Sequence, residues 1–239
     1  MIRILMFSFF LISIFTFSQS KVLINKDLKI TEDTLTRKKL VDVISHFILE
    51  KNIQNENLPN LNPEGKLETW LFLKELRKLQ NNKVFSTRYT LMYEMTSAEA
   101  QNKNNFTLHL NCFFSDGEIK NTVAEIELAV QEINGKYFIS SAIKNNLTHW
   151  KFKTIENYSF YSKNEFDEKK LKDFIAKNNQ LSVNLKEPKI PTKVYCVNDL
   201  YDAYELLGIN YKRFTSANNF FLGVDFVREN SQCAMIVAT

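Results

Sequence analysis

The apolar residues in the first third of the chain recur at helical spacing. The first predicted helix follows the capping candidates Thr31, Asp33 and Thr34. Its buried side is marked by four apolar residues, Leu40, Ile44, Phe47 and Ile48. A second helix is predicted after Asn62-Pro63-Glu64, because asparagine caps helices well and proline suits the first helical position. Its apolar side consists of Trp70, Leu73, Leu76 and Leu79.

The pattern then changes to strict alternation, which is typical of half-buried strands. The predicted strands are residues 85–95, 106–114, 124–130 and 137–143. Asn134-Gly135 joins the last two as a type I′ hairpin, because both residue types tolerate a positive φ. The chain is therefore predicted to be α+β, with two N-terminal helices packed on a curved antiparallel meander sheet.

Strands and helices alternate in the rest of the chain, which indicates a second, partial strand-helix-strand-helix-strand unit. In chain order, the predicted elements are a strand at 150–161, a helix at 165–178 capped by Asn164, a strand at 193–197, a helix at 200–207 capped by Asn198 or Asp199 and stopped by Gly208, and strands at 224–227 and 234–238. We predict two domains, at residues 21–147 and 148–239.

Residues 1–20 have the order of a secretory signal peptide. Arg3 precedes an apolar run at residues 4–17, and Ser18-Gln19-Ser20 supply small and polar residues for cleavage. The alternative is a retained membrane anchor, and the length of the apolar run favours a cleaved signal, because the run is shorter than the roughly 20 residues that span a membrane. We expect an exported chain, periplasmic or extracellular, that starts near Gln19 or Lys21 and has no stable membrane span after signal removal.

Composition and charge exclude several function classes. The net charge of +4 is spread along the chain without a basic block, so we expect no nucleic-acid partner. The five glycines lie too far apart to form a phosphate-binding loop. The three cysteines, Cys112, Cys196 and Cys233, have neither the spacing of a disulfide framework nor that of a metal motif. One disulfide would be compatible with an oxidising compartment, and the spacing does not select a pair.

Few side chains qualify as site residues. His109 alternates with Leu108 and Leu110, which predicts an exposed histidine on the strand face opposite the core. Asp42, His46 and Glu50 share one helix face and fit either metal ligands or a solvated charged face; no second cluster offers the remaining ligands.

We expect Glu205 to be a surface charge near the end of its helix. The serines lie in no glycine-flanked elbow of the kind that presents a nucleophile. Buried, inert thiols are the usual reading of cysteines such as Cys196 in strands. The sequence therefore assigns no catalytic, cofactor-binding or metal-binding residue.

Two family resemblances add expectations. The helix and strand order of residues 31–145, closed by Asn134-Gly135-Lys136-Tyr137-Phe138-Ile139, resembles the cone-shaped domains of the nuclear-transport-factor-like superfamily. That resemblance implies a pocket enclosed by the meander. Residues 145–239 resemble the opening of the exported gluzincin-type (peptidase clan MA-like) metallopeptidase-like proteins of Bacteroidota. The segments that carry this second resemblance are 146–151 (Asn-Leu-Thr-His-Trp-Lys), 195–199 (Tyr-Cys-Val-Asn-Asp) and 205–211 (Glu-Leu-Leu-Gly-Ile-Asn-Tyr).

The gluzincin resemblance implies a later helix with His-Glu-x-x-His, whose histidines bind zinc and whose glutamate acts as general base. None of the three histidines, His46, His109 and His149, belongs to such a motif. The last residues, 234–239, read as a buried strand, so we expect the catalytic part, with its zinc, only in a longer form.

Three functions follow as hypotheses. The first is that the chain is the accessory N-terminal region of a zinc-metallopeptidase-like protein and is inactive alone. The second is that it is an exported module that binds a peptide or small-molecule ligand in a cone pocket. The third is that it is a non-catalytic interaction protein that presents its sheet face to a partner.

Overall fold

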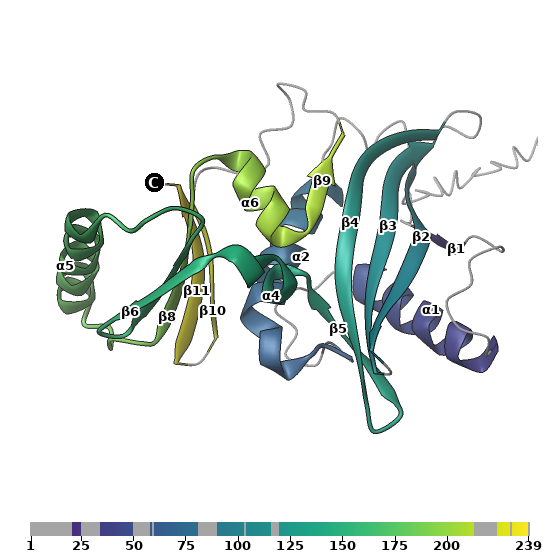
Figure 1. Cartoon of the computed structure of the whole chain (residues 1–239), viewed down its shortest axis with the longest axis horizontal. Helices are drawn as coiled ribbons and strands as arrows, with labels where there is room; N and C mark the ends of the chain where they lie inside the picture. The colour runs from purple at the N-terminus through teal and green to yellow at the C-terminus, as the bar shows by residue number, and fades with distance from the viewer. Residues whose placement is uncertain are drawn as a thin grey trace, which may run out of the picture.

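Two β-sheets lie on either side of one helix, α2 (Lys66–Gln80), in the computed structural model (Figure 1). The structure describes residues 21–24, 34–49, 58, 60–80, 90–102, 104–115, 120–212, 224–229 and 231–238. The predicted signal peptide, the capping candidates Thr31 and Asp33, and Glu50 lie outside these residues. No helix in the described ranges is long and apolar enough to cross a membrane.

The first sheet has six strands and confirms the predicted α+β fold with a curved meander (Figure 1). Its antiparallel strands are β2 (Thr90–Asn102), β3 (Asn105–Ser115), β4 (Lys120–Ile133) and β5 (Lys136–Ser141), with β1 (Lys21–Ile24) parallel to β2 and β9 (Ile209–Tyr211) antiparallel to β4. Residues 85–89 of the first predicted strand lie outside the described part.

Two local predictions are confirmed in detail. The Asn62 side chain accepts a hydrogen bond of 3.0 Å from the Glu64 backbone amide, and the short helix η1 (Pro63–Gly65) then leads into α2. Asn134 and Gly135 have φ angles of 53° and 74°, which the hairpin between β4 and β5 requires. Short-range geometry therefore sets both the start of α2 and the register of this hairpin.

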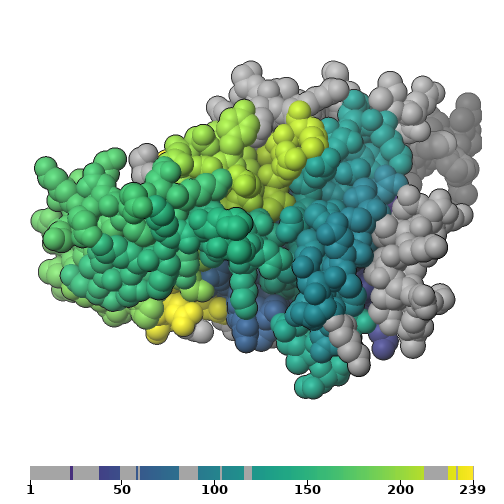
Figure 2. Space-filling model, viewed as in Figure 1, coloured from purple at the N-terminus to yellow at the C-terminus, as the bar shows by residue number. Residues whose placement is uncertain are grey.

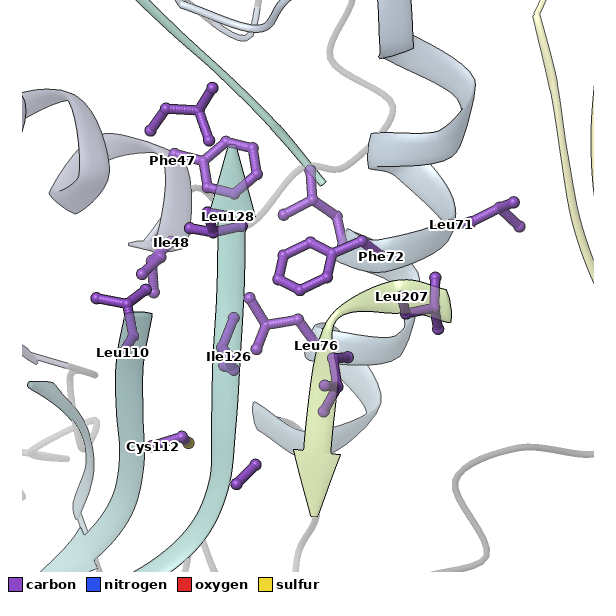
Figure 3. Packing of buried hydrophobic residues seen from close by; sticks show 14 of the residues in the cluster. Phe47, Ile48, Leu71, Phe72, Leu76, Leu110, Cys112, Ile126, Leu128 and Leu207 are labelled. Carbon is purple, nitrogen blue, oxygen red and sulfur yellow. The ribbon is translucent and has the colours of Figure 1, made fainter. Parts of the chain in front are cut away.

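Helices α1 (Thr34–Leu49) and α2 fill the inner face of the first sheet. The rings of Phe47 and Phe72 stack with centroids 6.2 Å apart, and Leu76 lies beside Ile126 (Figure 3). The resemblance to cone domains implied a pocket on this side. Close-packed aromatic and aliphatic side chains occupy the space instead.

The second sheet has five strands in the order β10-β11-β8-β7-β6. Its strands are β6 (Lys151–Ile155), β7 (Tyr158–Ser162), β8 (Thr192–Val197), β10 (Val224–Glu229) and β11 (Gln232–Ala238). Helix α5 (Glu168–Leu185) packs on one face with Leu171 and Ile175 buried. On the opposite face, residues of β8 and β11 join the core that contains α2.

The two parts of the chain share a continuous core. After α6 (Leu200–Leu207), strand β9 returns to the first sheet and pairs with β4 at Ala124–Ile126. One hydrophobic cluster contains Tyr195, Leu207 and Ile236 together with Phe72 and Leu110. The predicted boundary after residue 147 falls within η2 (Leu147–His149), directly after α4 (Ile143–Asn146), and stays a prediction.

Candidate ligand groove on the outer face of the meander

The outer face of the first sheet, which points away from α1 and α2, is polar because side chains alternate along each strand. His109 of β3 lies directly opposite Glu127 of β4 in the register, and Thr107 lies opposite Ala129. His109 is thus on the face opposite the core, as the alternation predicted. The side chain remains 36% exposed.

Two adjoining hollows run over this face and share His109 and Glu127. The first, here called the α6 hollow, has a volume of about 550 Å³ and lies against α6 and β9. The second, the amide hollow, has a volume of about 560 Å³ and lies over β3, β4 and α4. Together they form what we call the outer groove. Both volumes fall within the range of roughly 300–1,000 Å³ that is usual for ligand pockets.

The wall of the α6 hollow depends on Gly208, which ends α6 with a φ of 74°. A Cβ atom at this position would lie 2.9 Å from both the Ala142 Cβ and the Glu127 carbonyl oxygen. The Glu127 amide donates a hydrogen bond of 2.7 Å to the Gly208 carbonyl oxygen. Figure 2 shows the resulting contact, where the yellow-green surface of α6 and β9 meets the teal surface of the meander.

Asn146 closes the other side of this wall. Its side-chain amide donates hydrogen bonds to the carbonyl oxygens of Glu205 (2.8 Å) and Leu206 (3.3 Å). These two carbonyls belong to the last turn of α6, where intrahelical partners run out. At the other end of the helix, the Asp199 carboxylate accepts from the Asp202 amide at 2.9 Å, which confirms one of the two predicted caps.

Most carboxylates around the α6 hollow have a positive partner. Glu125 is 2.6 Å from the Lys212 ammonium, and Glu205 is 2.6 Å from that of Lys163. Lys163 also contacts Asp202 at 2.8 Å. Partial burial lowers the pKa of Lys163, but hydrogen bonds to Asp202 and Glu205 outweigh this effect and leave the pKa above its ordinary value. Glu205 therefore lies in an ion-pair cluster rather than alone on the surface.

Glu127 differs from these carboxylates. Within the part of the chain that the structure describes, its carboxylate has no hydrogen-bond or ion-pair partner, although the residue is half-buried. Across the sheet, the His109 Nε2 is 3.7 Å from the Glu99 carboxylate. The centre of the outer groove thus holds one histidine and one unpaired carboxylate in directly opposed positions.

The other sequence candidates do not converge on this groove. The His46 ring lies on the exposed side of α1, with Nδ1 2.9 Å from the Asp42 carbonyl oxygen. His149 is exposed in η2. No group of three His, Cys, Asp or Glu side chains in the described ranges could hold a metal ion.

The three cysteines are buried and free of disulfides. Burial raises the pKa of the Cys196 thiol to about 11, and it raises the pKa values of Cys112 and Cys233 as well. Such thiols stay protonated at neutral pH, and only the thiolate is a good nucleophile. This environment agrees with the expectation that Cys196 is a buried, unreactive thiol.

Sequence reasoning missed the groove. The alternation around His109 gave the correct face, but the register with Glu127 and the wall from α6 depend on contacts between distant segments. Comparison of the chain with protein-family models, curated proteins and solved structures found no match in any of the three sets.

Proposed function

We propose that this chain is a ligand-binding module and that the outer groove takes a short peptide segment. The observation that carries the proposal is the pair of adjoining hollows with His109 and Glu127 shared between them. Two connected hollows suit an elongated ligand better than a single compact one. The position on an outer sheet face leaves the core undisturbed when a ligand enters.

The lining of the amide hollow supports a peptide ligand. It combines amide and hydroxyl side chains that can both donate and accept hydrogen bonds, namely Asn62, Gln101, Asn105, Thr107, Gln131, Ser140, Asn145 and Thr148. Peptide groups need both kinds of partner, because each presents one N–H and one C=O. Two contacts within this set are already made: the Asn62 side-chain amide donates to the Gln131 side chain at 3.0 Å, and the Gln101 side-chain amide donates to the Thr107 hydroxyl at 3.3 Å.

A groove-filling variant tests the proposal. Ala129→Trp places an indole in the amide hollow from an outer-face position, so the core keeps its packing. We expect the variant to lose most of its binding to fluorescein-labelled peptides of about six residues, a length of about 20 Å when extended. Fluorescence anisotropy measures this binding.

Thr154→Trp is the matched control, because Thr154 is exposed on β6 in the other sheet. It should bind like the unmodified chain. If no peptide in a serine-rich, lysine-rich and glutamate-rich set binds the unmodified chain, or if Ala129→Trp binds as well as its control, the proposal is wrong.

A second proposal is that the chain belongs to an exported zinc-metallopeptidase-like protein as its accessory region. The specific support is that the three segments of the resemblance meet around α6. Asn146 bonds to the last turn of this helix, residues 195–199 lead into its N-cap, and residues 205–211 form its end and β9.

The intact mass and N-terminal sequence of the native exported product test this second proposal. We expect a product that starts near Gln19 or Lys21 and is heavier than a chain ending at Thr239, with His-Glu-x-x-His in the added part. A native mass that matches the mature chain ending at Thr239 would exclude the peptidase relationship for this molecule.

A further inference from the structure

We infer that the α6 hollow receives a cationic side chain of the bound peptide, a lysine ammonium or an arginine guanidinium, next to Glu127. This inference rests on the proposed peptide-binding function and adds the chemical class of the ligand. Three features of the hollow carry it: an unpaired carboxylate, the end of a helix and an exposed aromatic ring.

The first feature is the charge balance of the lining. Three carboxylates line the α6 hollow, those of Glu125, Glu127 and Glu205. Lys212 pairs with Glu125 and Lys163 pairs with Glu205, so two of the three negative charges are compensated. Glu127 has no such partner within the described residues, and it lines both hollows.

The partial burial of Glu127 makes this missing partner significant. A carboxylate that loses part of its hydration without gaining a partner raises the free energy of the empty state. A ligand cation would supply the missing partner and form a charge-assisted hydrogen bond, which is stronger than a neutral one. His109 lies opposite Glu127 in the register, and its Nε2 is 3.7 Å from the Glu99 carboxylate of β2.

The second feature is the direction of α6. Its C-terminal residues Tyr204, Glu205 and Gly208 line the hollow, so the negative end of the helix dipole lies at this site. Cations are stabilised near helix C-termini. The potential of the backbone therefore has the same sign as that of Glu127, and it does not depend on any ionisable side chain.

The third feature is Tyr201, whose ring lines the hollow from α6 and is 67% exposed. An aromatic face attracts a lysine or arginine head group within about 6 Å. Exposed large aromatic residues are also usual anchors at binding surfaces. A cationic side chain that reaches Glu127 past this ring would bury its aliphatic stem against the ring.

The lining of the amide hollow differs chemically from that of the α6 hollow, and this difference orients the bound peptide. Its cation, Lys144, has a side chain that is 87% exposed and is 3.7 Å from Glu64. Besides Glu127, the amide hollow is lined by one more carboxylate, that of Glu99, which is 3.7 Å from the His109 Nε2, and by the neutral amides and hydroxyls described above. We therefore place the peptide backbone in the amide hollow and its basic side chain in the α6 hollow.

Glu127→Gln tests the inference, because it removes the charge while keeping the shape. We expect the lysine-rich peptide to bind the full mature chain more tightly than the serine-rich and glutamate-rich peptides. Glu127→Gln should weaken lysine-rich binding about tenfold, the loss expected for one charge-assisted contact, and should leave serine-rich binding unchanged. Raised salt should weaken only the lysine-rich complex.

Glu132→Gln is the matched control, since it makes the same chemical change further along β4, outside the residues that line either hollow. It should leave all affinities unchanged. Thermal unfolding verifies that both variants fold; Glu127→Gln should not lower the Tm, because its carboxylate has no partner to lose among the described residues.

The outcomes separate the proposed peptide-binding function from the proposed preference for a cationic side chain. Equal affinity for the three peptides, with Ala129→Trp still blocking them, would leave the groove as a peptide site and overturn the cationic class. An unchanged lysine-rich affinity in Glu127→Gln would overturn it as well. Failure of all three peptides to bind would reject both the peptide site and the cation within it.

Discussion

Gly208 is the residue at which the α6 wall and the meander meet. Its carbonyl oxygen accepts from the Glu127 amide, and its Cα approaches Ala142 and the Glu127 backbone so closely that any side chain would collide. The left-handed conformation, with a φ of 74°, adds a second reason for glycine. One residue therefore ends a helix and lets two distant segments come into contact.

Gly208→Ala should destabilise the fold by about 2–4 kcal/mol, since it adds left-handed strain and overpacking. Gly135→Ala is the matched control. Gly135 has the same φ of 74°, but nothing lies within 4 Å of an added Cβ atom. It should cost only the strain of about 1–2 kcal/mol. Urea unfolding of both variants measures the difference, and equal losses would contradict the close approach at Gly208.

For His109, the sequence predicts the strand face on which the side chain lies but not the residue opposite. The alternation with Leu108 and Leu110 gives its face correctly, because side chains on a strand have a fixed period of two. Nothing in that pattern indicates that Glu127 will lie opposite, since the pairing of β3 with β4 is set by their register.

At the scale of elements, the bounds of a helix were predicted well where a capping residue marks its start and a glycine marks its end. For α6, Asp199 and Gly208 fix the two ends, and the predicted bounds 200–207 agree with the structure. The start of α5 was predicted wrongly. Asn164 was expected as its cap, but the Asp167 carboxylate accepts from the amides of Lys169 (2.9 Å) and Lys170 (3.1 Å).

The reason is that residues 164–167 contain two good capping side chains, and sequence preference does not distinguish them. In the structure the Asn164 amide instead donates to the Asn198 side chain at 2.7 Å, across to the start of α6. A contact between distant segments thus decides where α5 begins, and the helix runs to Leu185, seven residues beyond the predicted end at 178.

Two strand assignments needed tertiary information. The segment 150–161 was predicted as one strand but forms the hairpin β6–β7, with Glu156 at a φ of 52°. A non-glycine residue with positive φ is uncommon, so the sequence gives little warning of this turn. The strand β9 has only three residues and was not predicted, because its partner in β4 lies more than 80 residues earlier.

At the scale of the whole molecule, α2 is the element that both sheets share. Most of its residues are buried, including Glu68 and Glu75, although its sequence shows charged residues beside one apolar side. Glu68 accepts a hydrogen bond of 2.8 Å from the Tyr195 hydroxyl of β8 and also pairs with Lys193. Buried charges are usually paired in this way.

Tyr195 is held in place by this contact and by its ring. Burial, and then the negative charge of Glu68, keep the pKa of Tyr195 well above its ordinary value, so the hydroxyl remains a donor at neutral pH. The ring stacks on Tyr161 with centroids 5.1 Å apart. The Tyr195 side chain therefore couples the second sheet to the helix of the first.

Tyr195→Phe should lower the free energy of unfolding by about 1.5–3 kcal/mol, because a buried carboxylate loses a donor while the ring stack remains. Tyr161→Phe is the control on the same aromatic ladder; its half-buried hydroxyl has no hydrogen-bond partner in the described ranges. It should change stability by less than about 0.5 kcal/mol. Equal effects in chemical denaturation would show that the hydroxyl does not link the sheets.

The sequence by itself determined the local structure of this protein: the caps of α2 and α6, the hairpin at Asn134-Gly135, and the face on which His109 lies. These features depend on neighbours within a few residues and on side-chain periods fixed by backbone geometry. Only the tertiary structure decided that close-packed side chains occupy the space where a cone pocket was expected, and that α6 walls a groove on the outer face of the meander. Those outcomes depend on strand register and on close approaches such as that of Gly208 to Glu127. Such contacts join segments that are far apart in the sequence, so no pattern of neighbouring residues predicts them.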